Sequence, residues 1–171
     1  GHHLFATYPR DKPPIIYESG NSGLGEGWAL YSEYVAEELG LFSTPLDVQG
    51  MIAKHLWAAS RLVVEPGLHI YGWSREEAVQ FMLLNTVLSR TEIEIEVDRY
   101  LARPGQSLCY MFGADLIMSE RARARTLLGD AFDIKAFHDV VLEAGVRPLP
   151  VLRGDIRTWI DASVAQSHAH R

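Results

Sequence analysis

Apolar residues recur at helical spacing along most of this chain. From Glu26 they fall three or four positions apart as far as Leu39, and similar spacing returns in most later segments. Prolines and glycines interrupt the pattern at intervals, and such residues mark boundaries between helices. The sequence therefore predicts helices over 26–39, 45–66, 75–89, 91–101, 106–128, 134–144 and 148–164.

Several of the predicted ends carry capping residues. Thr44 precedes Pro45, a residue that suits the first turn of a helix. Ser74 is followed three positions later by Glu77, which is the spacing of a capping box. Glycines, which readily adopt the left-handed conformation that ends a helix, stand at three predicted stops: Gly40, Gly129 and Gly145.

The segment Thr91–Leu101 is ambiguous, because its alternation TEIEIEVDRYL has the period of a strand. We predict a helix there, since helical segments flank it and no partner strand is visible. Residues 4–25 are rich in turn-forming residues and are predicted to form a loop, while residues 165–171 are predicted to fray. The predicted fold class is all-α, with six or seven helices in a single domain over residues 1–171.

Composition narrows the possible functions. The chain has 171 residues, 16 Lys and Arg against 22 Asp and Glu, and a net charge of −6, so it lacks the basic character of proteins that bind nucleic acids or anionic membranes. Its 47% hydrophobic residues suit a globular domain, and no apolar run is long enough to span a membrane. The one cysteine, Cys109, excludes an internal disulfide and is expected to be a small buried residue.

A row of carboxylates gives the first indication of chemistry. Glu26 and Glu33 are seven positions apart, which is two turns on one helix face, and Glu37 follows four positions later. Such a row is unfavourable unless solvent or a cation neutralises it. The alternative for Glu26 is a purely electrostatic role, because a helix N-terminus favours a carboxylate. The neighbouring glycines do not have the order of a phosphate-binding loop.

The string GEGWALYSE closely resembles the NEGFAxYxE-type segment of gluzincin peptidases, in which the first Glu binds zinc. The whole chain resembles the C-terminal part of the bacterial zincin-like family catalogued as domain of unknown function 885. That family's pattern runs HExxPGHH, EGWALYxE, RLVVDxGxH, GWS, ERYxxxPGQALxY, FHDxVLxxG and PL. Corresponding segments occur here in the same order, at residues 1–3, 26–33, 61–69, 72–74, 98–110, 137–139 and 148–149.

The chain departs from the family pattern at a few positions. Glu65 stands where the family has Asp, and Asp98 stands where it has Glu, so both exchanges keep the charge. The first His and the Glu of HExxPGHH would lie before Gly1, which indicates that the chain is the C-terminal part of a longer protein. We expect the chain alone to bind zinc weakly or not at all and to be inactive, because a ligand and the general base are missing.

The resemblance implies a Zn²⁺ site and a peptide substrate. Its ligands would be the missing His, one of His2 and His3, and Glu26, with a fourth position left for the water that attacks the peptide carbonyl. His2 is the expected ligand, with His3 as its neighbour or as a substrate contact. Glu33 would orient a ligand or position the helix.

Four further polar residues are expected to form the wall of the same cleft. Tyr110 would donate a hydrogen bond to the tetrahedral oxyanion, with Tyr100 as its rival. Arg61 would anchor a carboxylate, either that of Glu65 or a substrate terminus. His69 would be a further donor. Gln106 would lie beside Tyr110 on one face of the long helix. Each also has a structural explanation: packing for Tyr110 and Gln106, a helix cap for His69 and a helix salt bridge for Arg61.

Two other classes of function compete with the peptidase. A carboxylate-bridged di-iron protein needs Glu-x-x-His pairs, whereas Glu65 and His69 are four positions apart. A catalytically inert helical interaction domain would keep the fold and lose the chemistry. His138, in an apolar helix, is expected to be structural. Both an exported and a cytoplasmic location agree with the sequence.

Overall fold

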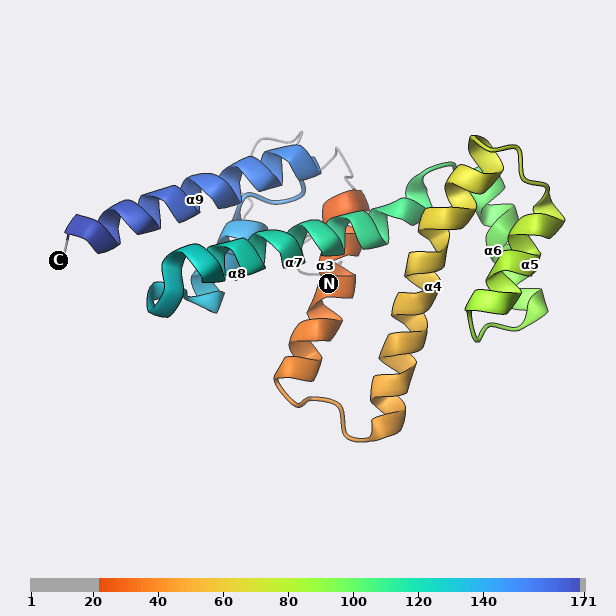
Figure 1. Cartoon of the computed structure of the whole chain (residues 1–171), viewed down its shortest axis with the longest axis horizontal. Helices are drawn as coiled ribbons and strands as arrows, with labels where there is room; N and C mark the ends of the chain where they lie inside the picture. The colour runs from red at the N-terminus through yellow and green to blue at the C-terminus, as the bar shows by residue number, and fades with distance from the viewer. Residues whose placement is uncertain (1–21, 170–171) are drawn as a thin grey trace. The chain divides into compact units, whose positions relative to one another are not determined.

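The computed structural model describes residues 22–169, and this part of the chain consists of helices and connecting loops without a strand (Figure 1). The predicted all-α fold class is therefore confirmed. In chain order the elements are α3 (Ser22–Glu38), α4 (Pro45–His69), α5 (Arg75–Asn85), α6 (Arg90–Ala102), η1 (Gln106–Leu108), α7 (Cys109–Leu128), η2 (Gly129–Ala131), α8 (Ile134–Glu143) and α9 (Leu149–Ala169). The elements labelled η are short 3₁₀ turns, and the others are α-helices.

Contacts divide the chain into two compact units. The first unit combines residues 1–31 with residues 112–171, and the second comprises residues 32–111. The single domain expected from the sequence stays a prediction. Within residues 22–169, no helix combines the length and apolar character needed to cross a membrane.

Capping explains where the helices of the second unit begin. Thr44 and Ser74 each form the predicted type of capping interaction, accepting a hydrogen bond from the backbone N–H three residues later. Ser89 forms a further capping box with Glu92, which starts α6 and leaves residues 86–89 as a connection. The predicted extension of the third helix to Ser89 is therefore wrong, and α5 ends at Asn85.

Two predicted helix ends are also wrong. Helix α4 continues through Pro66 to His69, because the backbone N–H groups of Ile70 and Tyr71 both donate to the Pro66 carbonyl and close the last turn beyond the proline. Helix α9 continues past Val164 to Ala169, since the chain contains no proline or glycine after Gly154 to stop it.

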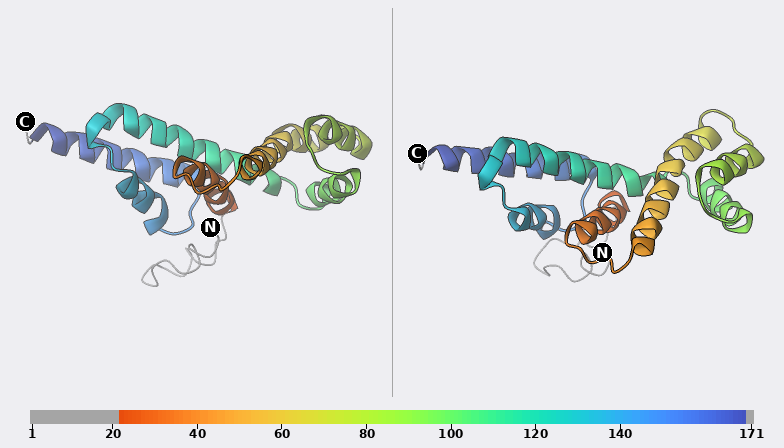
Figure 2. Two further views of the ribbon diagram at one scale, coloured as in Figure 1. Left: turned by 90° about the horizontal axis from the view of Figure 1, so that it is seen from below. Right: turned by 60° about the horizontal axis from the view of Figure 1, so that its bottom comes forward.

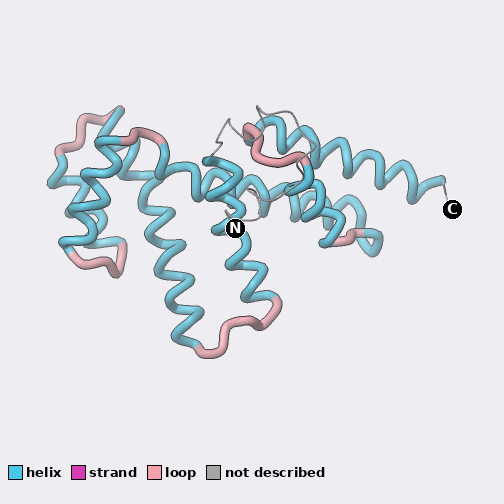
Figure 3. Tube along the Cα trace, turned by 180° about the vertical axis from the view of Figure 1, so that it is seen from behind, coloured by secondary structure: helices cyan, strands magenta, loops and turns pink. Residues whose placement is uncertain are grey.

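Helix α6 resolves the ambiguous alternating segment as predicted. Ile93, Val97 and Tyr100 follow the helical spacing and are fully or almost fully buried, whereas Ile95 is 64% exposed. The apolar residues of the segment therefore do not all enter the core, as they would on one face of a strand. The three buried residues of α6 pack with Val64 of α4 and with three residues of α5: Ala78, Val79 and Met82. Figure 3 shows α4, α5 and α6 connected by short loops.

Helices α3 and α7 of the first unit cross at two glycines. A Cβ atom added to Gly27 would lie 2.3 Å from the Cα atom of Gly113, and one added to Gly113 would lie 2.0 Å from the Gly23 carbonyl oxygen. Helix α9 runs beside α7 (Figure 2), and Arg157 of α9 pairs with the buried Glu120 of α7 at 2.8 Å. The two glycines allow the backbones of α3 and α7 to touch.

We predict that Gly27→Ala or Gly113→Ala lowers the free energy of unfolding by about 1–3 kcal/mol or more, because the new methyl group meets backbone atoms that cannot rotate away. Gly154→Ala is the matched control, since nothing lies within 4 Å of a Cβ atom at that helical position. The control is expected to be neutral or stabilising by about 1 kcal/mol. Urea denaturation measures all three, and equal stability of the Gly27 variant and the control would contradict the close crossing.

Candidate functional site

Glu26 lies in α3 and is half-buried. The helix begins at Ser22, four residues earlier than predicted, so Glu26 stands in the second turn rather than the first. Its expected partners His2 and His3 lie outside the described residues. Among residues 22–169, no group of three His, Cys, Asp or Glu side chains could hold a metal ion. The assignment of these zinc ligands therefore stays a prediction.

Glu33 is part of an ion-pair cluster in the second unit. Its carboxylate pairs with Lys54 and lies 3.0 Å from Nε2 of His55, whose ring meets Tyr34 edge-on at 4.3 Å between centroids. Burial raises the pKa of the Glu33 carboxyl, but the hydrogen bonds and charges of His55 and Lys54 outweigh it and hold the pKa below its usual value. Glu33 thus joins the end of α3 to α4, and a role in orienting a zinc ligand stays a prediction.

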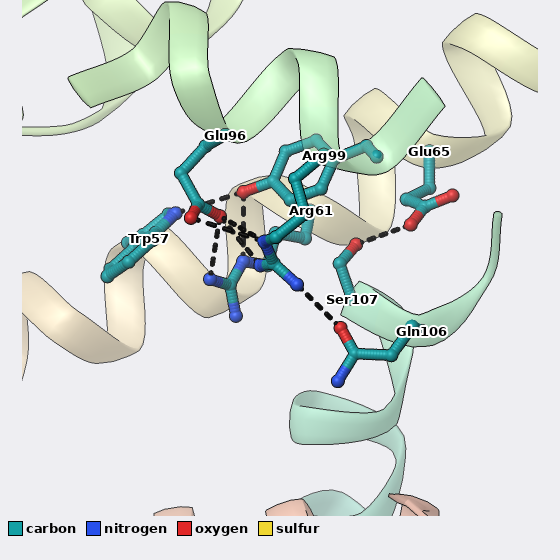
Figure 4. A network of polar contacts seen from close by, with 8 residues as sticks. Trp57, Arg61, Glu65, Glu96, Arg99, Gln106 and Ser107 are labelled. Carbon is teal, nitrogen blue, oxygen red and sulfur yellow. Dashed lines mark hydrogen bonds and ion pairs between the residues drawn. The ribbon is translucent and has the colours of Figure 1, made fainter. Parts of the chain in front are cut away.

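Arg61 is the centre of a polar network in the second unit (Figure 4). The residue is 4% exposed, and its Nε donates to the Tyr100 hydroxyl at 3.0 Å while Nη2 lies 3.3 Å from a Glu96 oxygen. Its guanidinium carbon is 4.2 Å from the ring centre of Trp57 and 4.7 Å from that of Tyr110. The carboxylate that neutralises Arg61 within the described chain is therefore Glu96, and the pair with Glu65 considered from the sequence does not form.

Glu65 instead holds the turn that precedes α7. Its buried carboxylate accepts hydrogen bonds from the Gly105 backbone N–H at 3.0 Å and the Ser107 hydroxyl at 2.7 Å. Nε2 of His69 lies 3.4 Å from the same carboxylate and 3.2 Å from the carbonyl oxygen of Tyr100. His69 therefore has local structural partners at the end of α4, and its role as a donor to substrate stays a prediction.

Tyr100 is unsuited to contact substrate. It is 1% exposed, and its hydroxyl accepts hydrogen bonds from Trp57 Nε1 at 3.1 Å and from Arg61. The hydroxyl also hydrogen-bonds Glu96, and burial raises the pKa of Tyr100. Tyr110 differs, because it is only half-buried while its ring faces the Arg61 guanidinium. Of the two tyrosines, Tyr110 is thus the better candidate for a substrate contact.

Gln106 reaches the network through Arg99. Its side-chain oxygen accepts a hydrogen bond from Arg99 Nη1 at 2.7 Å, and Arg99 Nη2 lies 2.6 Å from Glu96. Gln106 was expected at the start of the long helix, but it occupies η1, because Gly105, at φ +79°, forms a turn there. Arg61, Gln106 and Tyr110 therefore meet in one network, and Tyr100 connects it to His69. Glu26 lies in the other unit. The convergence of these residues on a substrate cleft with Glu26 stays a prediction.

Sequence reasoning missed Glu96, Arg99 and Trp57. Glu96 and Arg99 are three positions apart in α6, a spacing that usually indicates a solvent-exposed helix pair. Their side chains are only 18% and 30% exposed. The available signal was their position next to the buried Tyr100, which brings that face of α6 towards α4.

Two residues outside this network were assigned structural roles. His138 lies in the first unit with Nε2 2.7 Å from the Tyr31 hydroxyl, and Trp28 meets its ring edge-on. Such packing agrees with a structural histidine. Cys109 is half-buried rather than fully buried, and its Sγ lies 3.8 Å from the Gly105 carbonyl oxygen.

The charge of Glu96 is predicted to stabilise the second unit in a pH-dependent manner. Burial raises its pKa, but Arg99, Tyr100 and Arg61 outweigh that effect and hold the pKa below the ordinary value of 4.5. A depressed folded-state pKa stabilises the fold above the unfolded pKa, and this contribution is lost as the pH falls through the folded pKa. We expect Glu96→Gln to lower the free energy of unfolding by about 1–3 kcal/mol at neutral pH, and by progressively less in acid.

Asp98→Asn is the matched control, because Asp98 lies on the same helix but pairs with Arg75 at the surface. Its effect on stability is expected to be small. Chemical denaturation of both variants and the unmodified protein between neutral and acid pH measures the difference. A loss of stability in Glu96→Gln that stayed constant over this range would contradict the role of the carboxylate charge.

Comparison with known proteins places the chain in a family. A crystal structure described as that of "the putative lipoprotein from Colwellia psychrerythraea" is 41% identical and superposes with a TM-score of 0.83, covering 86% of this chain and 26% of that one. This chain thus spans about a quarter of that protein's length. No curated protein matches significantly. Residues 1–156 match the family described as "Bacterial protein of unknown function (DUF885)", and the chain belongs to that family.

Proposed function

We propose that this chain is part of a zinc-dependent peptidase that hydrolyses peptide bonds with metal-activated water. The observation that carries the proposal is the ordered series of motifs, in which the carboxylate of Glu26 follows Gly25 in the segment GEGWALYSE. The structure adds support, because the next residue, Gly27, lies at the crossing with α7 and limits how α3 can move within its unit. A carboxylate that serves as a metal ligand needs such a rigid support.

The described residues contribute one expected ligand of the zinc site. Glu26 would bind the ion together with His2 or His3 and the upstream histidine of the family motif. Zinc in such a site activates water for attack on a peptide carbonyl. The donor set of one carboxylate and two imidazoles is common in zinc hydrolases. Residues 22–169 do not complete that set by themselves, so the ligand assignment rests on the sequence resemblance.

Tyr110 would stabilise the oxyanion that develops on the attacked carbonyl. Its hydroxyl is a suitable donor because the ring is held against Arg61, 4.7 Å from the guanidinium carbon, and the side chain remains partly exposed. A pre-positioned donor needs little reorganisation during the reaction. Arg61 would thus act on Tyr110 as a positioning residue.

An exported location would suit such an enzyme. The similar protein from Colwellia psychrerythraea is described as a lipoprotein, and lipoproteins are exported. The 41% identity makes the same compartment the simplest proposal for this chain.

We predict that Glu26→Gln removes zinc from a version of this protein that includes the upstream His-Glu-x-x-Pro segment. An amide is a poorer zinc ligand than a carboxylate, so we expect zinc content after dialysis to fall from about one ion per chain to a small fraction of that. Glu37→Gln is the matched control, because Glu37 is exposed on the same helix. Metal analysis and a peptide-hydrolysis assay measure both variants. Absence of zinc and of hydrolysis in the unmodified protein would favour the inert helical interaction domain.

We predict that Tyr110→Phe in the same zinc-containing protein lowers kcat by about 100-fold, as for the loss of one oxyanion donor. Zinc content and melting temperature should change little, because the ring keeps its contact with Arg61. Tyr71→Phe is the control, since Tyr71 is 76% exposed. Tyr100→Phe should instead lower the melting temperature, because it removes the hydroxyl that Trp57 and Arg61 need. An unchanged kcat in Tyr110→Phe would remove Tyr110 from the reaction.

A further inference from the structure

Two guanidinium groups share one carboxylate in the network around Arg61. Arg61 and Arg99 both pair with Glu96. The carboxylate of Glu65 faces away from this pairing, because its oxygens contact Gly105, Ser107 and His69. Two guanidinium groups that share one carboxylate in a partly buried place favour a further anionic ligand.

The hydrogen bonds within the network leave donors available. Arg61 uses Nε for Tyr100 and Nη2 for Glu96, while its Nη1 contacts no acceptor among residues 22–169. Arg99 uses Nε and Nη2 for Glu96 and Nη1 for Gln106. The side chain of Arg61 is 5% exposed and that of Arg99 is 30% exposed, so the network opens to solvent on the side of Arg99.

Two aromatic rings line the guanidinium of Arg61. Trp57 and Tyr110 both contact it, at 4.2 Å and 4.7 Å from the guanidinium carbon to the ring centres. Their contacts orient the planar group, so that its remaining N–H donors keep a defined direction. A planar carboxylate matches the fork of a guanidinium in two parallel hydrogen bonds. A phosphate can pair with a guanidinium in the same way, so the choice of a carboxylate rests on the proposed peptide substrate.

We propose that Arg61 and Arg99, supported by Gln106 and Tyr110, form a subsite that binds the C-terminal carboxylate of a peptide. This inference rests on the proposed peptidase function for the identity of the ligand. It implies that the enzyme acts near the C-terminal end of its substrates and favours short peptides with a free terminus. Arg99 makes the first contact because it is the more exposed guanidinium, and Arg61 provides the buried charge behind it.

The binding step can be measured without zinc, on the chain as it is. Trp57 donates its indole N–H to Tyr100 within the network, and the chain has four tryptophans, so its indole signal can be assigned in a ¹H–¹⁵N spectrum with Trp57→Phe. N-acetyl-dialanine, which has a free carboxylate, is expected to shift this signal in a saturable manner. The same dipeptide with an amidated C-terminus is expected not to shift it. Equal shifts from the acid and the amide, or none from either, would overturn the subsite.

Arg99→Gln should weaken binding of the acid by about tenfold or more, since a charge-assisted hydrogen bond is lost. Arg75→Gln is the matched control, because Arg75 also pairs with a carboxylate of α6 but lies outside the network. Arg99→Lys, which keeps the charge but not the fork, should bind with intermediate affinity and covers the case in which Arg99→Gln fails to fold. Inorganic phosphate is titrated in parallel. Tighter binding of phosphate than of N-acetyl-dialanine would identify a general anion site instead.

Activity of the zinc-containing version distinguishes failure of this inference from failure of the proposed function. Arg99→Gln should lower the ratio of kcat/KM for peptides with a free C-terminus to kcat/KM for amidated peptides about tenfold, mainly through KM. If kcat/KM is the same for acid and amidated peptides, and the same in Arg99→Gln as in the unmodified protein, the subsite is rejected while the proposed peptidase function is kept. Carboxylate binding by a protein without peptidase activity would keep the subsite and reject the proposed function.

Discussion

The second unit depends on the burial of one positive charge, that of Arg61. A guanidinium that is 4% exposed is strongly unfavourable unless it is paired and its N–H donors are satisfied. Glu96 of α6 supplies the opposite charge and Tyr100 of the same helix supplies an acceptor, so α6 can lie against α4 only in a register that brings both to Arg61. Trp57 and Tyr110 then cover the faces of the guanidinium.

Glu65 imposes a second constraint, one turn further along α4. Its buried carboxylate needs the donors of Gly105 and Ser107, and this requirement holds the turn between α6 and α7. The same turn carries Gln106 to Arg99 and presents Tyr110 at the start of α7. The guanidinium groups that hold these helices together are therefore also those proposed to bind substrate, and a change at Arg61 is expected to affect both stability and chemistry.

Local signals were sufficient for most of the helices. Thr44, Ser74 and the glycines at the stops act through their immediate neighbours, which is why reasoning from the sequence placed most helix starts and several stops correctly. Pro66 was wrongly predicted to end α4. The helix continues beyond it because the backbone N–H groups of residues 70 and 71 donate to the Pro66 carbonyl. The pairing of Arg61 with Glu96, 35 positions away, has no local signal at all, whereas the nearer Glu65 offered a plausible but incorrect partner. The family motif singled out Tyr110 and Gln106, but the contact of Tyr110 with Arg61 and that of Gln106 with Arg99 needed the structure.

The proposed peptidase function depends on the binding of zinc by Glu26. The most direct measurement is anomalous X-ray scattering at the zinc edge from crystals of the version that includes the upstream His-Glu-x-x-Pro segment. We expect one strong anomalous peak about 2 Å from the Glu26 carboxylate and from a ring nitrogen of His2 or His3. A zinc-containing crystal whose only peak lies away from Glu26, or a crystal grown with zinc that shows no peak, would contradict it.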